Sequence, residues 1–417
     1  MCIRDRISLV HKIGRVIVPK PLAIVTFGHS LNHGMDVTYG ALLVLIGAEF
    51  DVDLATLGLI GTLGAVVYGV IAIPGGLLTD RIGFGKTLIL ALIGSGMSAL
   101  VVCGSVNIIS LALGLMLVGA FGGVFHPAGL AFVASDVRRR STGMGVFGAG
   151  GNLGVAITPV IVMSIAAVYG WRAGFYIFSG LLIFSGLLML SVHRSLESSD
   201  KEKSNQELDR SDAMNSIRGS RGVAVFPTAM IILVNSCLGF LYRGTVTFLP
   251  LHFLNNSQFS IFGFDSITIA GFLVTGTLLM GAFGQYIGGI LGDRTKKEPL
   301  LIVLAVLLFP LLLAVGWSTG WVLILVTAAY ALVYFMAPPS YNALAAEYVA
   351  PQLRGRVFGL IFFGAFGIGS FGSWVGGLVA ESFDTGAVFL ALSGVSALVI
   401  VAAVALLIYS GNVKNRP

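Results

Sequence analysis

The sequence contains twelve apolar runs, each about as long as an α-helix that crosses a lipid bilayer. The runs cover residues 22–46, 54–78, 86–105, 108–134, 142–168, 173–192, 224–250, 267–291, 299–316, 320–345, 355–380 and 387–409. Only 11% of the residues are charged, whereas a soluble domain carries about 25%. Most of the helices therefore lack a polar face for water. We predict an all-α membrane protein with twelve transmembrane helices, not a soluble core.

A polar segment, 193–222, separates the first six runs from the last six and is rich in Ser, Asp, Glu, Lys and Arg. Its composition is typical of a linker. We therefore predict two six-helix bundles, 22–192 and 223–410, joined by a cytoplasmic linker. Residues 1–21 form a cytoplasmic lead and residues 411–417 a cytoplasmic tail.

The two halves of the chain also repeat each other. The second run ends in GLLTDR at 76–81, and the eighth ends in GILGDR at 289–294. Prolines recur in the same way, with Pro127 in the fourth run and Pro339 in the tenth. An internal duplication is common in secondary transporters, which hold their substrate near the bilayer midplane between the repeats.

The basic residues predict the orientation in the membrane. Of the 25 Lys and Arg residues, all but Arg172 and Arg243 fall on one side of the predicted bundles. The opposite connections, such as 49–53, are acidic or neutral. The positive-inside rule makes the basic side cytoplasmic, with both termini there and the chain in the inner (plasma) membrane. The net charge of +6 is then a topology signal and requires no nucleic-acid partner.

The sequence shows no motif of an enzyme or of a metal cluster. Cys2, Cys103 and Cys237 are isolated, which excludes a CxxC pair. Neither HExxH, GxSxG nor a P-loop is present. We expect no enzymatic activity and no cofactor.

The segment 76–86 resembles the loop signature of the major facilitator superfamily, in which Gly, three residues and Asp-Arg precede basic positions. Phe84 and Gly85 replace the expected basic pair, whereas the second copy keeps Lys296 and Lys297. The resemblance implies two pseudo-symmetric six-helix bundles that transport by alternating access. It implies as partners a small-molecule substrate, protons and the lipid bilayer, for a monomeric chain.

A narrower resemblance is to the fosmidomycin-resistance-like branch of this superfamily. It rests on residues 125–129, 148–154, 170–172, 242–244 and 247–250. The resemblance implies a small organic substrate and adds Asn152 to the candidate site. The first helix of this branch usually carries a His and then Asn-Asp. This chain has His29, Asn32 and His33, and its acid lies at Asp36.

The fifth run partly matches the superfamily's antiporter signature, in which glycines and a Gly-Pro bend the helix. Gly145, Gly154 and Pro159 fit the signature. Three positions where glycines are expected hold other residues, namely Thr158, Val162 and Met163. The match favours export over import.

The first run carries the main candidate site. His29, Asn32, His33 and Asp36 follow the spacing of one helical face. A charged side chain at the bilayer centre costs about 2.5–3.5 kcal/mol on insertion scales, so it persists where it faces a cavity or a partner. In the fold implied above, the first and seventh helices line one cavity, where Asp36 can meet Arg243.

Together with the antiporter resemblance, which implies export, these residues predict proton-coupled efflux (antiport) of a small anionic or amphipathic molecule. Histidine titrates near physiological pH, so Asp36, His29 and His33 are candidates for carrying the proton. Arg243 would bind an anionic group of the substrate. His126, in the fourth run, can join the cluster.

Three alternatives remain open at this stage. Asp36 and Arg243 can form a purely structural bridge. His29, His33 and Asp36 are also a plausible ligand set for Zn²⁺ or Fe²⁺ in a divalent transition-metal transporter, although Arg243 would repel a cation. The chain can also be a membrane sensor or scaffold that transports nothing.

The repeated motif predicts a conformational gate at the cytoplasmic ends of the helices. The gate residues are Gly76, Asp80, Arg81, Gly289, Asp293 and Arg294. The acids can cap a neighbouring helix or pair with basic residues, and remaking these contacts would bias inward- and outward-facing states. The alternative is a static surface bridge, which contributes little to stability.

Overall fold

The computed structural model describes residues 19–136, 140–192, 225–257, 263–348 and 354–414, and within these ranges the chain forms helices and no strands. The first half contains α2 (Lys20–Ala41), α3 (Leu43–Phe50), α4 (Leu54–Ile82), α5 (Phe84–Cys103), α6 (Ile108–Asp136), α7 (Arg140–Tyr169) and α8 (Trp171–Leu190). The second half contains α10 (Val225–Asn256), α11 (Ser266–Arg294), α12 (Lys297–Trp317), α13 (Gly320–Tyr348), α14 (Arg354–Phe363), η2 (Gly364–Ile368), α15 (Phe371–Ser382) and α16 (Thr385–Lys414). The predicted linker lies outside the described residues, as does most of the predicted lead.

Eleven helices of the described chain are long and apolar enough to cross a membrane. They match the predicted runs from the second to the twelfth, which confirms the all-α membrane fold. The first predicted run differs, because it folds as α2 and α3 with a break at Leu42. The polar residues of α2, His29, Asn32, His33 and Asp36 among them, make it less apolar than the other spans.

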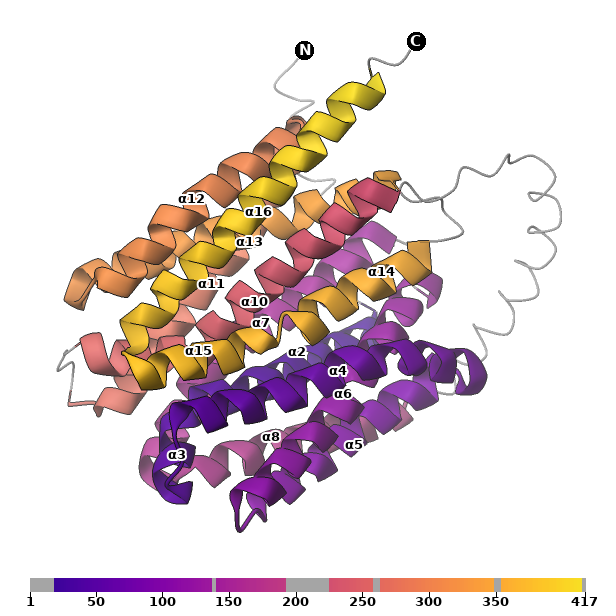
Figure 1. Ribbon diagram of the computed structural model, residues 1–417. Coiled ribbons are helices and arrows are strands. Elements are labelled where there is room, and N and C mark those ends of the chain that lie inside the picture. Colours follow the sequence, from indigo (N-terminus) through magenta and orange to yellow (C-terminus); the bar gives the residue numbers. More distant parts are fainter. Residues whose placement is uncertain (1–18, 137–139, 193–224, 258–262, 349–353, 415–417) are drawn as a thin grey trace, which may run out of the picture.

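The packing of the helices repeats in the two halves. In the first half α4 packs on α6, α5 on α8 and α2 on α7, and in the second half α11 packs on α13 and α12 on α16. The halves meet along two equivalent seams, α7 on α11 and α4 on α15. Figure 1 shows the first half in indigo to magenta on one side and the second half in rose through orange to yellow on the other.

The two ends of the bundle differ in charge. The basic end carries Lys20, Arg81, Lys86, Arg294 and Lys297. The acidic end carries Glu49, Asp53, Asp265, Glu381 and Asp384. At the acidic end, Asp53 accepts a hydrogen bond from the Thr56 backbone N–H at 2.6 Å, and Asp265 accepts one from Thr268 at 2.8 Å. Each aspartate caps a helix N-terminus. The second and eighth spans therefore resemble each other at their N-terminal ends as well as at their C-terminal ends.

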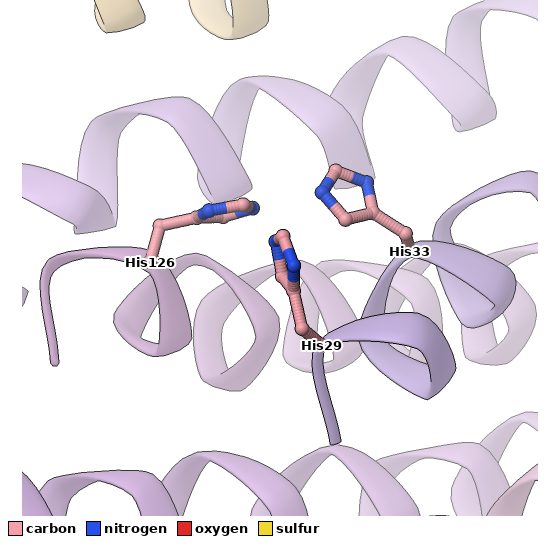
Figure 2. A group of neighbouring side chains, drawn as sticks. All are labelled: His29, His33 and His126. Atoms are coloured by element: carbon pink, nitrogen blue, oxygen red, sulfur yellow. The ribbon is translucent and has the colours of Figure 1, made fainter. Parts of the chain in front are cut away.

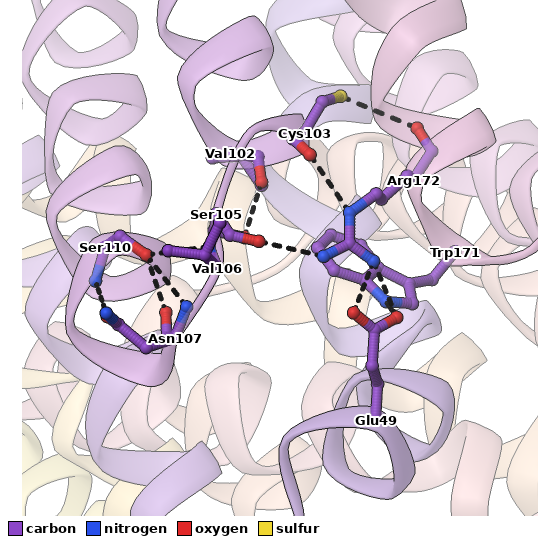
Figure 3. A network of polar contacts seen from close by, with 9 residues as sticks. All are labelled: Glu49, Val102, Cys103, Ser105, Val106, Asn107, Ser110, Trp171 and Arg172. Carbon is purple, nitrogen blue, oxygen red and sulfur yellow. Dashed lines mark hydrogen bonds and ion pairs between the residues drawn. The ribbon is translucent and has the colours of Figure 1, made fainter.

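A polar network at the acidic end holds α3 against α8 and α5, as Figure 3 shows. Arg172 pairs with Glu49 at 2.5 Å and donates to the backbone carbonyls of Cys103 at 3.0 Å and Ser105 at 2.8 Å. Trp171 donates its indole N–H to Glu49 at 2.7 Å. Arg172, one of the two basic residues away from the basic side, thus joins three elements of the first half.

We expect Glu49→Gln to lower the melting temperature at pH 7 and to have a smaller effect in acid. Hydrogen bonds from Arg172 hold the pKa of Glu49 below its ordinary value of 4.5. A lowered folded-state pKa stabilises above the unfolded value, and this contribution is lost as the pH falls through the folded value. Because the Glu49 side chain is 42% exposed, the difference is at most about 1 kcal/mol. Thermal unfolding of the purified protein between pH 7 and pH 3 measures it.

Asp51→Asn is the matched control for Glu49→Gln. Asp51 is exposed and has a φ of 50°, a conformation that asparagine tolerates well. The control removes the same charge from the same end of the bundle and should leave the melting temperature unchanged. A loss from Glu49→Gln that does not shrink as the pH falls from 7 to 3 would contradict the role assigned to the ion pair.

Candidate functional site

The polar residues of α2 face the interior of the molecule, as their spacing predicts. His29 and Asn32 are each 4% exposed, and the Asp36 side chain is 10% exposed. Asn32 donates hydrogen bonds to the Tyr68 hydroxyl at 3.2 Å and to the Gly122 carbonyl at 3.4 Å. The α2 face therefore contacts α4 and α6 within its own half.

Asp36 and Arg243 form an ion pair between the two halves, from α2 to α10. The Arg243 Nη1 lies 2.9 Å from Asp36 Oδ1, and the Arg243 side chain is 6% exposed. Its Nε and Nη2 are buried and have no hydrogen-bond partner among the described residues. The rings of Tyr242 and Phe366 lie 5.9 and 5.7 Å from the guanidinium carbon. Arg243 thus keeps donors free although Asp36 balances its charge.

A small cavity of about 60 Å³ adjoins the ion pair. Asp36 and Arg243 line it together with Tyr68 of α4 and Thr247 and Ser373 of the second half. The Thr247 and Ser373 hydroxyls lie 2.7 Å apart. Both halves therefore supply polar groups to this space, as the predicted central cavity requires.

A second cavity of about 190 Å³ is lined by His33 and by aromatic and amide residues. Asn152 of α7 and Gln285 of α11 line it and are hydrogen-bonded to each other across the halves. Tyr242 and Tyr334 also line it. This cavity combines aromatic surface with amide groups, a lining suited to a small organic ligand.

Three histidines gather beside these cavities. His29 and His33 of α2 and His126 of α6 converge in Figure 2, and their potential metal-binding atoms all lie within 4.8 Å of one another. The His29 Nδ1 lies 2.7 Å from the Phe147 carbonyl, and its ring stacks on the Phe147 ring at 3.8 Å. Asp36 does not belong to this group in the described chain, and His126 takes the place that we predicted for the acid among the metal ligands.

Several residues of the site were not predicted from the sequence. Tyr68, Gln285, Phe366 and Ser373 all lie within apolar runs, where a tyrosine, phenylalanine or serine usually packs without a specific role. Gln285 gave the clearest signal, because it is the lone amide in its run. Such a residue indicates an interior partner, and here the partner is Asn152.

A π-helical segment places Phe366 at the centre of the site. The eleventh span consists of α14, η2 and α15, and the α-helical pattern gives way to a π-helix over Gly364–Ile368. The Phe366 ring lies 5.6 Å from the Tyr68 ring and 6.3 Å from the His126 ring. Single π-helical turns often occur at functional sites, and this one brings an aromatic side chain of the second half onto the first.

The halves contact each other closely in the part of the bundle near the acidic end. The Leu54 N–H donates to the Glu381 carboxylate at 2.9 Å, and the Thr62 hydroxyl donates to the Ser370 carbonyl at 2.9 Å. An added Cβ at Gly58 would collide with the backbone carbonyl of Ser373. Only glycine permits so close an approach of α4 to α15.

The predicted gate residues lie at the basic end. The four charged members are exposed, namely Asp80, Arg81, Asp293 and Arg294. An added Cβ at Gly289 would meet nothing within 4 Å, and one at Gly76 would meet only Pro127, at 4.0 Å. Neither glycine is needed for close packing in this conformation.

Two packed repeats in the membrane, with a buried charged site between them, are the architecture of a secondary transporter. The chain belongs to the Major Facilitator Superfamily, whose family model matches residues 22–373 and 261–417. Both the fold and the family predicted from the repeated motif are confirmed. The members that resemble this chain are transporters, not enzymes.

The chain is 25% identical over 383 residues to the fosmidomycin resistance protein of Escherichia coli strain K12, covering 86% of each chain. It is 27% identical over 264 residues to a protein of Cupriavidus necator described as a probable sulfoacetate transporter, covering 61% of this chain and 60% of the relative. A crystal structure of a peptide transporter in complex with alafosfalin superposes with a TM-score of 0.75 at 15% identity, covering 96% of both chains. At that identity the structural match shows the fold alone.

Proposed function

We propose that this chain is a proton-coupled transporter of a small organic anion, with Arg243 binding the anion and Asp36 carrying the proton. The observation that carries the proposal is the buried ion pair between the halves, in which Nε and Nη2 of Arg243 have no partner among the described residues. A carboxylate, sulfonate or phosphonate can accept hydrogen bonds from such a guanidinium. Sulfoacetate, named for one relative, is an anion of this kind.

We assign the remaining site residues by their position around this pair. Asn32 orients Tyr68 beside the smaller cavity. Asn152 lines the larger cavity, where it can contact the body of the substrate. His29, His33 and His126 lie next to the pair and can relay a proton to and from Asp36.

We also propose that the basic end faces the cytoplasm of a bacterial cell, with the chain in the plasma membrane and both termini inside. Residues 22–192 and 223–410 would then form the two moving bundles of a monomer. The contacts of Leu54 with Glu381 and of Thr62 with Ser370 would close the extracellular side. The motif residues from Gly76 to Arg81 and from Gly289 to Arg294 would close the cytoplasmic side in the alternate state.

Two modes of proton coupling are candidates, and they differ in whether the proton moves against the anion or with it. Export by antiport is favoured by Gly145, Gly154 and Pro159 and by the relative that is named for resistance to fosmidomycin. The ion pair favours proton–anion symport instead. A proton on Asp36 removes the negative charge that competes for Arg243, so the proton and the anion would bind together.

A flux assay in proteoliposomes tests the proposal and separates these candidates. With a pH-sensitive dye inside, we expect sulfoacetate or fosmidomycin added outside to change the internal pH as the anion enters. Antiport would make the lumen alkaline, and symport would make it acidic. Protein-free vesicles and Arg243→Ala vesicles serve as controls. No internal pH change with any small organic anion would contradict proton coupling, and no uptake of labelled anion either would leave the sensor or scaffold alternative in place of transport.

A further inference from the structure

The three-histidine group has properties that proton relay alone does not require. His29 is 4% and His126 is 7% exposed, so both rings are withdrawn from water. The Nε2 atoms of both rings are buried and have no hydrogen-bond partner among the described residues. A buried polar atom without a partner is costly unless something binds it. Two such nitrogens at one place indicate a position where a ligand can bind.

The tautomer of His29 suits a metal ligand. A carbonyl oxygen only accepts hydrogen bonds, so the His29 Nδ1 must carry the proton that it shares with Phe147 at 2.7 Å. The Nε2 of His29 therefore keeps its lone pair. Metal-binding histidines commonly donate their other N–H to a backbone carbonyl in this way, which fixes the orientation of the ring. The His29 ring also stacks on the Phe147 ring, with the ring centroids 3.8 Å apart and an interplanar angle of 3°, and this contact further restrains the orientation of the imidazole.

The spacing of the three rings is close to that of a metal site. Zn–N bonds of about 2.0–2.1 Å in a tetrahedral site place the nitrogens about 3.4 Å apart. The ligand atoms here lie within 4.8 Å of one another, so small ring rotations would bring them together. His33 also lines the 190 Å³ cavity, which provides an entry path and room for a fourth ligand.

The nearby charges permit a cation. Arg243 would repel it if its charge stood alone, but Asp36 lies 2.9 Å from the guanidinium and balances it. Repulsion by Arg243 was the main argument from the sequence against a metal ion, and the pairing with Asp36 removes it. It also takes Asp36 out of the ligand set and leaves three neutral imidazoles, which suit Zn²⁺, Cu²⁺ and Ni²⁺ better than the oxygen-binding Mg²⁺ or Ca²⁺.

We infer that His29, His33 and His126 form a binding site for a divalent transition-metal ion of the Zn²⁺ type, with one position open to the larger cavity. The site is made by α2 and α6, within one half, and is covered by Phe362 of the other half, whose ring lies 5.1 Å from that of His126. Metal binding would therefore respond to the separation of the halves. The inference does not depend on Asp36 as the proton carrier or on the identity of the substrate, but imidazoles that bind a metal ion cannot also relay protons, so it replaces the relay role of the three histidines.

Co²⁺ is the probe for this site, because tetrahedral coordination of cobalt gives visible absorption bands. The protein is purified without a polyhistidine tag, in detergent, and titrated with Co²⁺ and then with competing Zn²⁺. We expect visible bands that saturate at one equivalent and disappear with Zn²⁺. His33→Ala and His126→Ala should each weaken Co²⁺ binding at least about tenfold. Absence of the bands, or unchanged affinity in both alanine variants, would overturn the inference.

Two further variants separate ligation from folding. His126→Cys keeps a ligand atom at that position and should add a thiolate-to-cobalt charge-transfer band, and its absence would overturn the assignment of His126. His252→Gln is the control, because both ring nitrogens of His252 are already bonded, to the Thr385 hydroxyl at 2.9 Å and to the Val315 carbonyl at 3.0 Å. We expect this control to bind Co²⁺ as tightly as the unaltered protein does.

Discussion

Arg243→Ala is expected to weaken binding of the transported anion by about 150-fold or more and to abolish its flux. The unaltered guanidinium offers two buried donors that have no other partner among the described residues. Hydrogen bonds to a charged group contribute about 1.5–3 kcal/mol each, so losing two costs at least about 3 kcal/mol. Titration calorimetry with each anion that shows flux measures the loss.

Two comparison variants sharpen this result. Arg243→Lys keeps the charge but loses the planar fork, so we expect intermediate affinity. Arg172→Lys makes the same change at the other basic residue that lies away from the basic side, and should leave affinity unchanged. An Arg243→Ala protein that folds and binds the anion normally would show that the substrate site is elsewhere.

The double variant Asp36→Leu/Arg243→Met separates a functional pair from a structural one. Removing one member of a buried pair destabilises by about 3–5 kcal/mol, whereas replacing both by apolar residues is often neutral or stabilising. A purely structural bridge therefore predicts a stable double variant that still transports. The proposed function predicts a stable double variant without anion binding. Thermal unfolding and flux of the same preparation decide between them.

The sequence predicts the fold well because the bilayer imposes a simple rule. A span must be long, apolar and internally hydrogen-bonded, and eleven of the twelve runs satisfy this rule as helices. The break at Leu42 and the π-helix over Gly364–Ile368 were not predictable. Both are local backbone changes within apolar segments, and they depend on packing between helices that are distant in the sequence.

The candidate site was predictable where a charged or polar residue is conspicuous within an apolar run. Asp36 and Arg243 stand out because each is a charge deep within an apolar run, and the structure pairs them. The partners of uncharged residues depend on the tertiary fold. Gln285 meets Asn152 only because α7 lies along α11, and His126 completes the histidine group only because α6 faces α2.

Asp36→Asn is expected to abolish uphill transport driven by a pH gradient while leaving exchange of the anion across the membrane in place. Asparagine cannot carry the transported proton, but its carbonyl oxygen can still accept a hydrogen bond from Arg243 at the distance of the present pair, 2.9 Å. The anion site therefore survives while the coupling is lost. Counterflow of labelled anion at equal pH measures exchange, and accumulation against a gradient measures coupling.

The controls for Asp36→Asn follow from the two roles assigned to the residue. Asp265→Asn makes the same chemical change at a helix cap, where asparagine caps about as well as aspartate, so it should leave both measurements unchanged. Asp36→Glu keeps a proton carrier and should keep partial coupling. If gradient-driven accumulation by Asp36→Asn equals that of the unaltered protein, Asp36 does not carry the proton. The neighbouring histidines would then be the remaining candidates, and Asp36 would serve only to balance the charge of Arg243.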